Sequence, residues 1–147
     1  MKYSRNIFYS FIALVLLSLV GCNLGSMNKN QTSFAAKLTA ASEVPATTSK
    51  GKGTLKGQVD NKTSILTWTI NYSDLSGPVT GAHFHGPAVK GKNADVAVPI
   101  TGNLANPISG TATLTATQMQ ELLDGQWYVN LHTAANPDGE IRGQISK

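Results

Sequence analysis

A β-strand with one buried face is predicted by Ser64-Ile65-Leu66-Thr67-Trp68-Thr69-Ile70-Asn71-Tyr72, the clearest alternating stretch in the sequence. Every second side chain in it is apolar, at Leu66, Trp68, Ile70 and Tyr72. This period of two is typical of a strand that packs one face on a core and leaves the other polar. Asp60-Asn61-Lys62 predicts a turn before it, and Gly77-Pro78 predicts one after it.

Further strands are predicted on both sides of this stretch, at 34–40, 53–59, 94–100, 108–114, 127–132 and 140–146. One short helix is expected near 116–124, capped by Thr115 or Thr117 and ended by Asp124-Gly125. Short strands separated by Gly, Pro and Asn turns predict an all-β domain. We expect an antiparallel β-sandwich with Greek-key connections and this one helix.

The first residues predict an export signal instead of part of the domain. Lys2 and Arg5 precede an apolar run over 7–20, which is shorter than a membrane span and ends at Gly21-Cys22. Cys22 is the only cysteine, so it has no disulfide partner within the chain. The pattern resembles a bacterial lipoprotein signal, in which Cys22 carries lipid and becomes the new N-terminus.

This resemblance divides the chain into a signal peptide (1–21), a lipidated flexible tether (22–32) and one domain (33–147). It implies a protein held at the membrane by lipid on Cys22, on the extracytoplasmic side of the cell envelope. The net charge is only +4, and Lys2 and Arg5 of the signal contribute to it. So small and scattered a charge excludes a nucleic-acid footprint.

All three histidines of the chain lie in two dense stretches, His83-Phe84-His85 and 127–133. On a strand His83 and His85 share one face, and Phe84 takes the opposite, core-facing side. In the last hairpin, inward Ile141 and Ile145 place Leu131 opposite Ile141, Asn130 opposite Arg142 and His132 opposite Glu140. The predicted outer face carries Tyr128, Asn130, His132, Glu140, Arg142 and Gln144.

Two interpretations of the histidines follow. Neutral imidazole is a common ligand of zinc and copper, so His83, His85 and His132 form a candidate site for one Cu or Zn ion. Alternatively, His83 and His85 bond loop carbonyls near Gly86-Pro87, and His132 is satisfied by Glu140. The metal site requires the three rings to converge.

Four motifs in order resemble the CHRD domain, a domain named from chordin that also occurs in secreted and envelope bacterial proteins. They are Gly81-Ala82-His83-Phe84-His85-Gly86-Pro87-Ala88, Leu122-Leu123-Asp124-Gly125, Tyr128-Val129-Asn130-Leu131-His132-Thr133, and Asn136-Pro137-Asp138-Gly139-Glu140-Ile141-Arg142-Gly143-Gln144-Ile145. Leu38-Thr39-Ala40-Ala41-Ser42-Glu43-Val44-Pro45 also fits its opening pattern. The resemblance spans about 34–146. It implies an all-β extracytoplasmic domain and no established general activity. The β-sandwich that we expect is immunoglobulin-like or superoxide-dismutase-like.

A weaker likeness to copper/zinc superoxide dismutases rests on the His-x-His strand. Three histidines are too few for the two metals of such an enzyme, and the sequence has no nucleophile elbow. We therefore expect a binding module for an unknown protein or small ligand, without evident catalytic activity. Its functional surface is predicted at the three histidines, supported by Tyr128, Asn130, Glu140 and Arg142. The alternatives are a single-site copper or zinc protein and a structural envelope or matrix protein.

Overall fold

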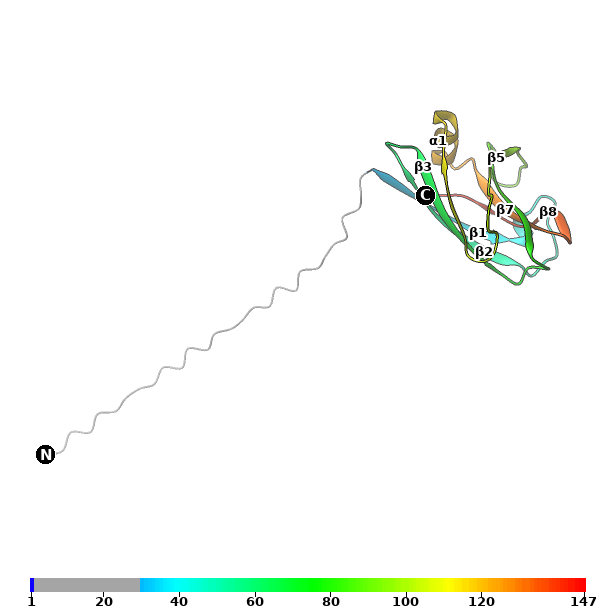
Figure 1. Ribbon diagram of the computed structural model, residues 1–147, viewed down its shortest axis with the longest axis horizontal. Coiled ribbons are helices and arrows are strands. Elements are labelled where there is room, and N and C mark those ends of the chain that lie inside the picture. The colour runs from blue at the N-terminus through cyan, green and yellow to red at the C-terminus, as the bar shows by residue number, and fades with distance from the viewer. Residues whose placement is uncertain (2–29) are drawn as a thin grey trace.

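The computed structural model describes Met1 and residues 30–147, where the chain forms an antiparallel β-fold with one α-helix (Figure 1). The predicted all-β class is confirmed. The described strands are β1 (Gln31–Thr39), β2 (Lys52–Asp60), β3 (Ile65–Ser73), β4 (Val79–His85), β5 (Val96–Pro99), β6 (Ile108–Thr113), β7 (Tyr128–Thr133) and β8 (Asn136–Gln144). A 3-10 turn, η1 (Ala40–Ser42), follows β1, and α1 (Ala116–Leu123) lies where the helix was predicted.

The described strands form a single hydrogen-bonded sheet in the order β5-β4-β7-β8-β1-β2-β3-β6. One half contains β1, β2, β3 and β6, and the other contains β4, β5, β7 and β8. The halves meet at the β1–β8 seam, where Thr39 pairs with Arg142, and Ala35 bridges to Ser146 just beyond β8. The sheet curves until its halves face each other, nearly as a barrel (Figure 1). The two packed layers of the predicted sandwich are therefore parts of one continuous sheet.

The core lies between the two halves. Leu66, Trp68 and Ile70 of β3 are buried, as their alternation predicted. The Trp68 ring meets Phe84 of β4 edge to face, with ring centroids 5.0 Å apart. Trp68 also covers Gly110 of β6, where an added Cβ would lie 2.5 Å from the indole. The missing side chain at Gly110 therefore makes room for the indole in the core.

The helix closes one end of this core. Thr115 caps it, because its side chain accepts from the Gln118 backbone N–H while the Gln118 side chain accepts from the Thr115 N–H. Leu122 is buried, and Gly125 follows with a φ of 71°, as the predicted Asp124-Gly125 ending requires. The helix thus joins β6 in one half to β7 in the other.

Apart from Met1, the predicted signal peptide lies outside the described residues, as do Cys22 and most of the predicted tether. β1 begins at Gln31 and pairs there with Asp60, so its first residues fall within the 22–32 segment expected to be a tether. Among the residues that the structure describes, no helix has the length and apolarity needed to span a membrane. The portion from residue 30 to 147 contains every described strand and the whole described core.

The last hairpin follows the predicted register only in part. Leu131 pairs with Ile141 and Asn130 with Arg142, as expected. The predicted pairing of His132 with Glu140 is wrong, because the register shifts between Leu131 and Thr133, and Thr133 pairs with Asn136. The extra residues of β8 bulge at Pro137 to Gly139, and the φ of 128° at Gly139 suits this irregular turn. His132 therefore faces the Pro137 carbonyl instead of Glu140.

Glu140 is fully buried and connects two loops with the end of β7. Its carboxylate accepts from Ser49 Oγ at 2.6 Å, from Ser76 N at 2.7 Å and Ser76 Oγ at 2.6 Å, and from Thr133 Oγ1 at 2.5 Å. Burial alone raises the pKa of this carboxyl, but these hydrogen bonds outweigh it and lower the pKa to about 2. Glu140 therefore has a structural role, away from the histidines.

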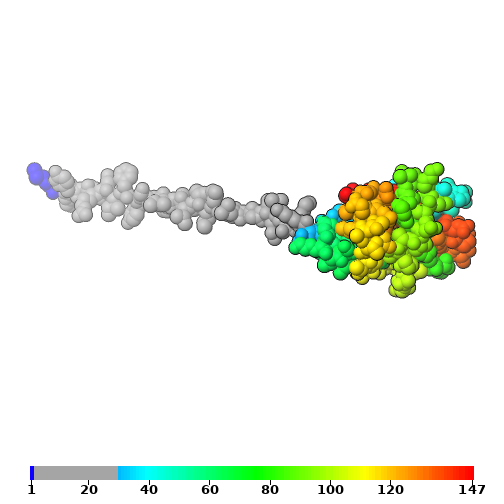
Figure 2. Space-filling model, turned by 90° about the horizontal axis from the view of Figure 1, so that it is seen from above, coloured from blue at the N-terminus to red at the C-terminus, as the bar shows by residue number. Residues whose placement is uncertain are grey.

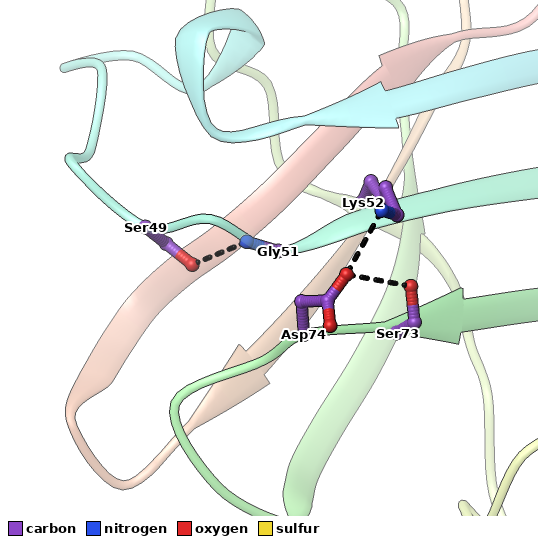
Figure 3. Close-up of polar contacts among 5 residues, drawn as sticks. All are labelled: Ser49, Gly51, Lys52, Ser73 and Asp74. Carbon is purple, nitrogen blue, oxygen red and sulfur yellow. Dashed lines mark hydrogen bonds and ion pairs between the residues drawn. The ribbon is translucent and has the colours of Figure 1, made fainter.

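The loop that holds Ser49 is itself anchored at the start of β2. Ser49 Oγ accepts from the Gly51 N–H at 2.8 Å, and the nearby Lys52 forms an ion pair with Asp74 at 2.9 Å (Figure 3). Ser73 also donates to Asp74, at 3.1 Å (Figure 3). These contacts fix the ends of β2 and β3 next to each other and leave the Ser49 hydroxyl free to donate to Glu140.

The predicted outer face of the last hairpin is covered rather than exposed. Tyr128, Asn130 and Arg142 are each no more than 3% exposed. The segment 86–95 crosses over them: Arg142 donates to Asn93 Oδ1 at 2.9 Å and to the Lys92 carbonyl. In the space-filling view the light-green atoms around this segment lie between the yellow-orange atoms near α1 and the orange-red β7–β8 turn (Figure 2). Strand alternation alone did not predict this cover.

Candidate functional site

The site is built on the pairing of β4 with β7. His83 lies opposite Asn130, His85 opposite Tyr128, and Gly81 opposite His132. Residues that lie opposite each other in adjacent strands share a face. The two strands therefore bring the histidines together, and one nitrogen of each ring lies within 4.8 Å of the corresponding atoms of the other two.

Asn130 occupies the middle of this group. Its Oδ1 lies 3.1 Å from His85 Nε2 and 3.0 Å from His132 Nε2. His83 Nδ1 lies 3.0 Å from the same His132 nitrogen. Three imidazoles and one carboxamide thus converge on a single point, which we call the histidine site.

Backbone carbonyls fix the tautomers of two of the rings. His85 Nδ1 lies 2.9 Å from the Ala94 carbonyl, and His132 Nδ1 lies 2.8 Å from the Pro137 carbonyl. A carbonyl oxygen only accepts, so each Nδ1 carries a hydrogen and donates. The neutral rings of His85 and His132 therefore present bare Nε2 lone pairs to the histidine site.

Burial favours the uncharged forms of His83 and His85. It lowers the pKa of His83, and the neighbouring His132 and His85 lower it further. Burial also lowers the pKa of His85, and this outweighs the hydrogen bonds to Ala94 and Asn130, which act in the opposite direction. The unprotonated forms, which have lone pairs to offer, are thus favoured near neutral pH.

A stack of rings supports one side of the site. His85 lies flat on Tyr128, with centroids 4.7 Å apart and planes 3° from parallel. The Arg142 guanidinium carbon lies 3.3 Å from the centroid of the Tyr128 ring, close enough for a cation–π contact. Tyr128 and Arg142, both predicted as supporting residues, therefore hold His85 in place. Glu140, the other predicted supporter, lies elsewhere with its serine and threonine partners.

Glu43 is a site residue that sequence reasoning missed. Its side chain is 7% exposed, and its Oε1 has no hydrogen-bond partner among the described residues. Burial raises its pKa to about 7, although Arg142 and the Val44 N–H act against this rise. Glu43 belongs to the Ser42-Glu43-Val44-Pro45 break after the first strand, which gave a turn signal but no sign of burial.

A pocket of about 370 Å³ opens between Glu43 and the histidine site. The residues that line it are Glu43, Val44, Pro45, His85, Asn93, Ala94, Tyr128, Asn130, His132 and Asp138. Asn93, also missed from the sequence, donates to the Val44 carbonyl at 3.0 Å and so joins the two loops that cover the pocket. The pocket thus combines two neutral imidazoles with a buried carboxyl group.

Gly139 leaves the space in which Glu43 and Asn130 approach each other. A Cβ at this position would lie 2.6 Å from Glu43 Oε1 and 2.9 Å from Asn130 Nδ2. We expect Gly139→Ala to lower the free energy of unfolding by about 1–3 kcal/mol more than Gly102→Ala does. Gly102 also has a positive φ, of 92°, but nothing lies within 4 Å of the added Cβ. Urea denaturation of both variants measures the difference, and equal losses would contradict this close approach.

Comparison with known proteins gives one match. The family model described as CHRD domain matches residues 34–145, which is most of the chain. No curated protein and no solved structure matches the chain.

Proposed function

The chain belongs to the CHRD domain family, and on this premise we propose that it is an extracytoplasmic binding module whose ligand site is the pocket between Glu43 and the histidine site. The observation that carries the proposal is the unpartnered Oε1 of Glu43, a buried polar atom that lines this pocket. A buried polar group without a hydrogen bond destabilises a fold, and such groups are rare unless a ligand satisfies them.

The pocket also suits a ligand by its construction. Asn130 and Tyr128 come from β7 and His85 from β4, so the pocket floor is a rigid sheet. Its cover comes from loop residues such as Val44, Pro45 and Asn93. Small-ligand sites are usually largely preformed, with loop residues held in place by a rigid scaffold.

A ligand screen of the segment 30–147 tests this proposal. A ligand of the pocket raises the melting temperature of the wild-type segment and of Gln58→Ala, which changes the exposed side of β2. The same ligand has no effect on Asn130→Ala, or on His132→Gln if Asn130→Ala does not fold. A ligand-induced rise that is equal in all the variants would place binding elsewhere. A screen without hits would favour a structural role in the envelope or matrix.

Membrane attachment through Cys22 is the second part of the proposal. Its support is the basic and apolar order of residues 2–20 followed by Gly21-Cys22. Several acyl chains on one residue anchor a protein stably, whereas one chain binds only marginally. The proposed location is therefore the extracytoplasmic face of a membrane in the cell envelope.

Replacement of the lipidated residue tests the anchor. We expect Cys22→Ala to leave the signal uncleaved or to move the protein from the membrane fraction to the soluble fraction. Metabolic labelling with a tagged fatty acid and fractionation measure both effects, with Ser26→Ala as the control. Unchanged labelling of Cys22→Ala would contradict lipidation at this residue.

A single copper or zinc ion is the second candidate function. It is favoured by one specific observation, the three histidine nitrogens within 4.8 Å of one another. The same pocket would then serve as the approach to the ion.

A further inference from the structure

The histidine site contains more hydrogen-bond acceptors than donors. In their uncharged forms, with a hydrogen on Nδ1, His85 and His132 both point Nε2 lone pairs at Asn130 Oδ1, from 3.1 and 3.0 Å. The Nδ1 hydrogens of both rings are already donated to the Ala94 and Pro137 carbonyls. Two acceptors at hydrogen-bond distance repel each other unless a proton or a cation lies between them.

The spacing of the ring nitrogens fits one metal ion. A tetrahedral ion with metal–nitrogen bonds of about 2.0–2.1 Å holds its ligand atoms about 3.4 Å apart. His83 Nδ1 and His132 Nε2 are already 3.0 Å apart, and the remaining separations do not exceed 4.8 Å. Small rotations of the side chains therefore bring all three nitrogens to bonding distance.

His83 is free to adopt either tautomer, whereas the tautomers of His85 and His132 are fixed by backbone carbonyls. Among residues 30–147 no backbone carbonyl is bonded to the His83 ring, so its hydrogen is free to sit on either nitrogen. With the hydrogen on Nδ1, His83 donates to His132 Nε2. With the hydrogen on Nε2, it offers a third lone pair from Nδ1. The carbonyl-bound rings of His85 and His132 match the arrangement in which a second partner fixes the tautomer of a metal-binding histidine.

Glu43 provides an independent sign of a ligand at this place. More than nine-tenths of the residue is buried, and Oε1 has no partner in the described part of the chain although Glu43 lines the same pocket as His85 and His132. The negative charge of the ionised Glu43 carboxylate attracts a divalent cation.

We propose that His83 Nδ1, His85 Nε2 and His132 Nε2 bind one Cu²⁺ or Zn²⁺ ion, whose fourth position faces the pocket and Glu43. This inference rests on the proposed function, because it names the ligand of the same pocket. Three imidazoles without thiolate favour copper and zinc over magnesium and calcium, which prefer oxygen ligands. For the same nitrogen ligands Cu²⁺ binds more tightly than Zn²⁺.

The direct test is metal binding by the chelator-treated segment 30–147. Calorimetry and metal analysis should give one ion per chain for each of Cu²⁺ and Zn²⁺, with no binding of Mg²⁺ at equal concentration. The copper form should show nitrogen hyperfine splitting from three imidazoles in its electron paramagnetic resonance spectrum. The absence of a stoichiometric ion would overturn the inference.

Ligand variants locate the ion. We expect His85→Gln and His132→Gln each to lower the affinity about 100-fold or more, because each removes one of three ligands. Glutamine still has an N–H with which to reach the carbonyl that the histidine met, so thermal melting of the metal-free variants checks the fold. Unchanged affinity in a folded variant would place the metal elsewhere.

A matched pair of charge variants tests the role of Glu43. Glu43→Gln and Asp138→Asn each remove one carboxylate from the pocket lining, but Glu43 is buried and Asp138 is exposed. We expect Glu43→Gln to lower the metal affinity about 10- to 100-fold, as loss of an outer partner does, and Asp138→Asn to lower it less than about twofold. Equal effects of the two substitutions would show that Glu43 acts only through its charge and has no specific role at the site.

Different experimental results would contradict the metal inference and the proposed function. If no ion binds but another ligand binds and is lost in Asn130→Ala, the pocket is a binding site and the metal inference is wrong. In that case the Asn130 amide presents its NH₂ group to the two bare Nε2 atoms, and no cation is needed. If an ion binds at a place unaffected by His85→Gln, His132→Gln and Asn130→Ala, and no screened ligand depends on Asn130, both proposals are wrong.

Discussion

Glu140→Ala is expected to lower the free energy of unfolding at pH 7 by roughly 2–3 kcal/mol or more, because four hydrogen-bond donors, one of them on the buried Thr133, lose one charged acceptor. The Ser49 and Thr133 hydroxyls and both donors of Ser76 meet this carboxylate at 2.5–2.7 Å. Two loops and the end of β7 would therefore lose their common partner. Urea denaturation at pH 7 measures the loss, and Asp138→Asn, an exposed carboxylate of the same hairpin, is the control.

The contribution of Glu140 has a defined pH window. Its pKa falls from 4.5 to about 2 on folding, so the unfolded chain binds more protons between these values. Stability is therefore fully present above about pH 4.5 and is lost as the pH falls towards 2. In Glu140→Gln this acid-side dependence should be absent. If the variant and the wild-type protein lose stability in parallel between pH 5 and pH 2, the assignment to Glu140 is wrong.

Glu43→Gln is expected to stabilise the metal-free protein at pH 8 by roughly 2–3 kcal/mol. Here the pKa rises from 4.5 to about 7 on folding, because the carboxyl is buried. The folded state then binds more protons than the unfolded chain, and stability falls as the pH rises from 4.5 to 7. Glutamine keeps the shape of the neutral carboxyl and removes this cost.

The two proteins should differ little at pH 4, where Glu43 is protonated in both states of the wild-type chain. Arg142, His85, His132 and Asp138 are the charged or titratable groups around this carboxyl. Denaturation with a chelator present, at pH 4 and pH 8, measures the difference. A wild-type protein as stable as Glu43→Gln at pH 8 would show that Glu43 ionises without cost.

The buried carboxyls of Glu140 and Glu43 have opposite effects on the stability of the fold when they ionise. Glu140 is fully satisfied by hydrogen bonds and stabilises the fold when ionised. Glu43 is buried without a partner for Oε1 and destabilises the fold when ionised. A strongly perturbed group that faces a pocket and weakens the fold is typical of a functional site.

Local patterns predicted the elements well because they depend on near neighbours. Alternation in 64–72 placed Leu66, Trp68 and Ile70 in the core, and the same rule separated core-facing Phe84 from the two histidines beside it. The Thr115 cap and the Gly125 ending of α1 follow from backbone chemistry within one turn. These predictions required no knowledge of the tertiary fold.

The errors arose where the chain departs from regular pairing. The bulge at Pro137 to Gly139 shifts Glu140 away from His132, and a strict two-residue period has no means of showing it. The cover of Asn130 and Arg142 by segment 86–95 comes from a loop, whose path depends on tertiary contacts. Glu43 was missed for the same reason, since its burial depends on strands and loops far away in the sequence.

The sequence predicted the convergence of the histidines only in part. The sequence predicted which side chains share a strand face, but β4 and β7 are separated by β5, β6 and α1. Only the strand order shows that they are neighbours. The His85–Tyr128 stack and the carbonyl contacts of Ala94 and Pro137 follow from that pairing and from the adjacent loops.

The β1–β8 seam also has a consequence for the order of folding. It joins the first described strand to the last, so the sheet is incomplete until almost the whole chain is available. β7, which carries Asn130 and His132, lies between β4 and β8 and pairs with both. Such distant pairings make folding slow and leave little native structure in an unfinished chain. The histidine site should therefore appear late, and a chain that ends before β8 should lack it altogether.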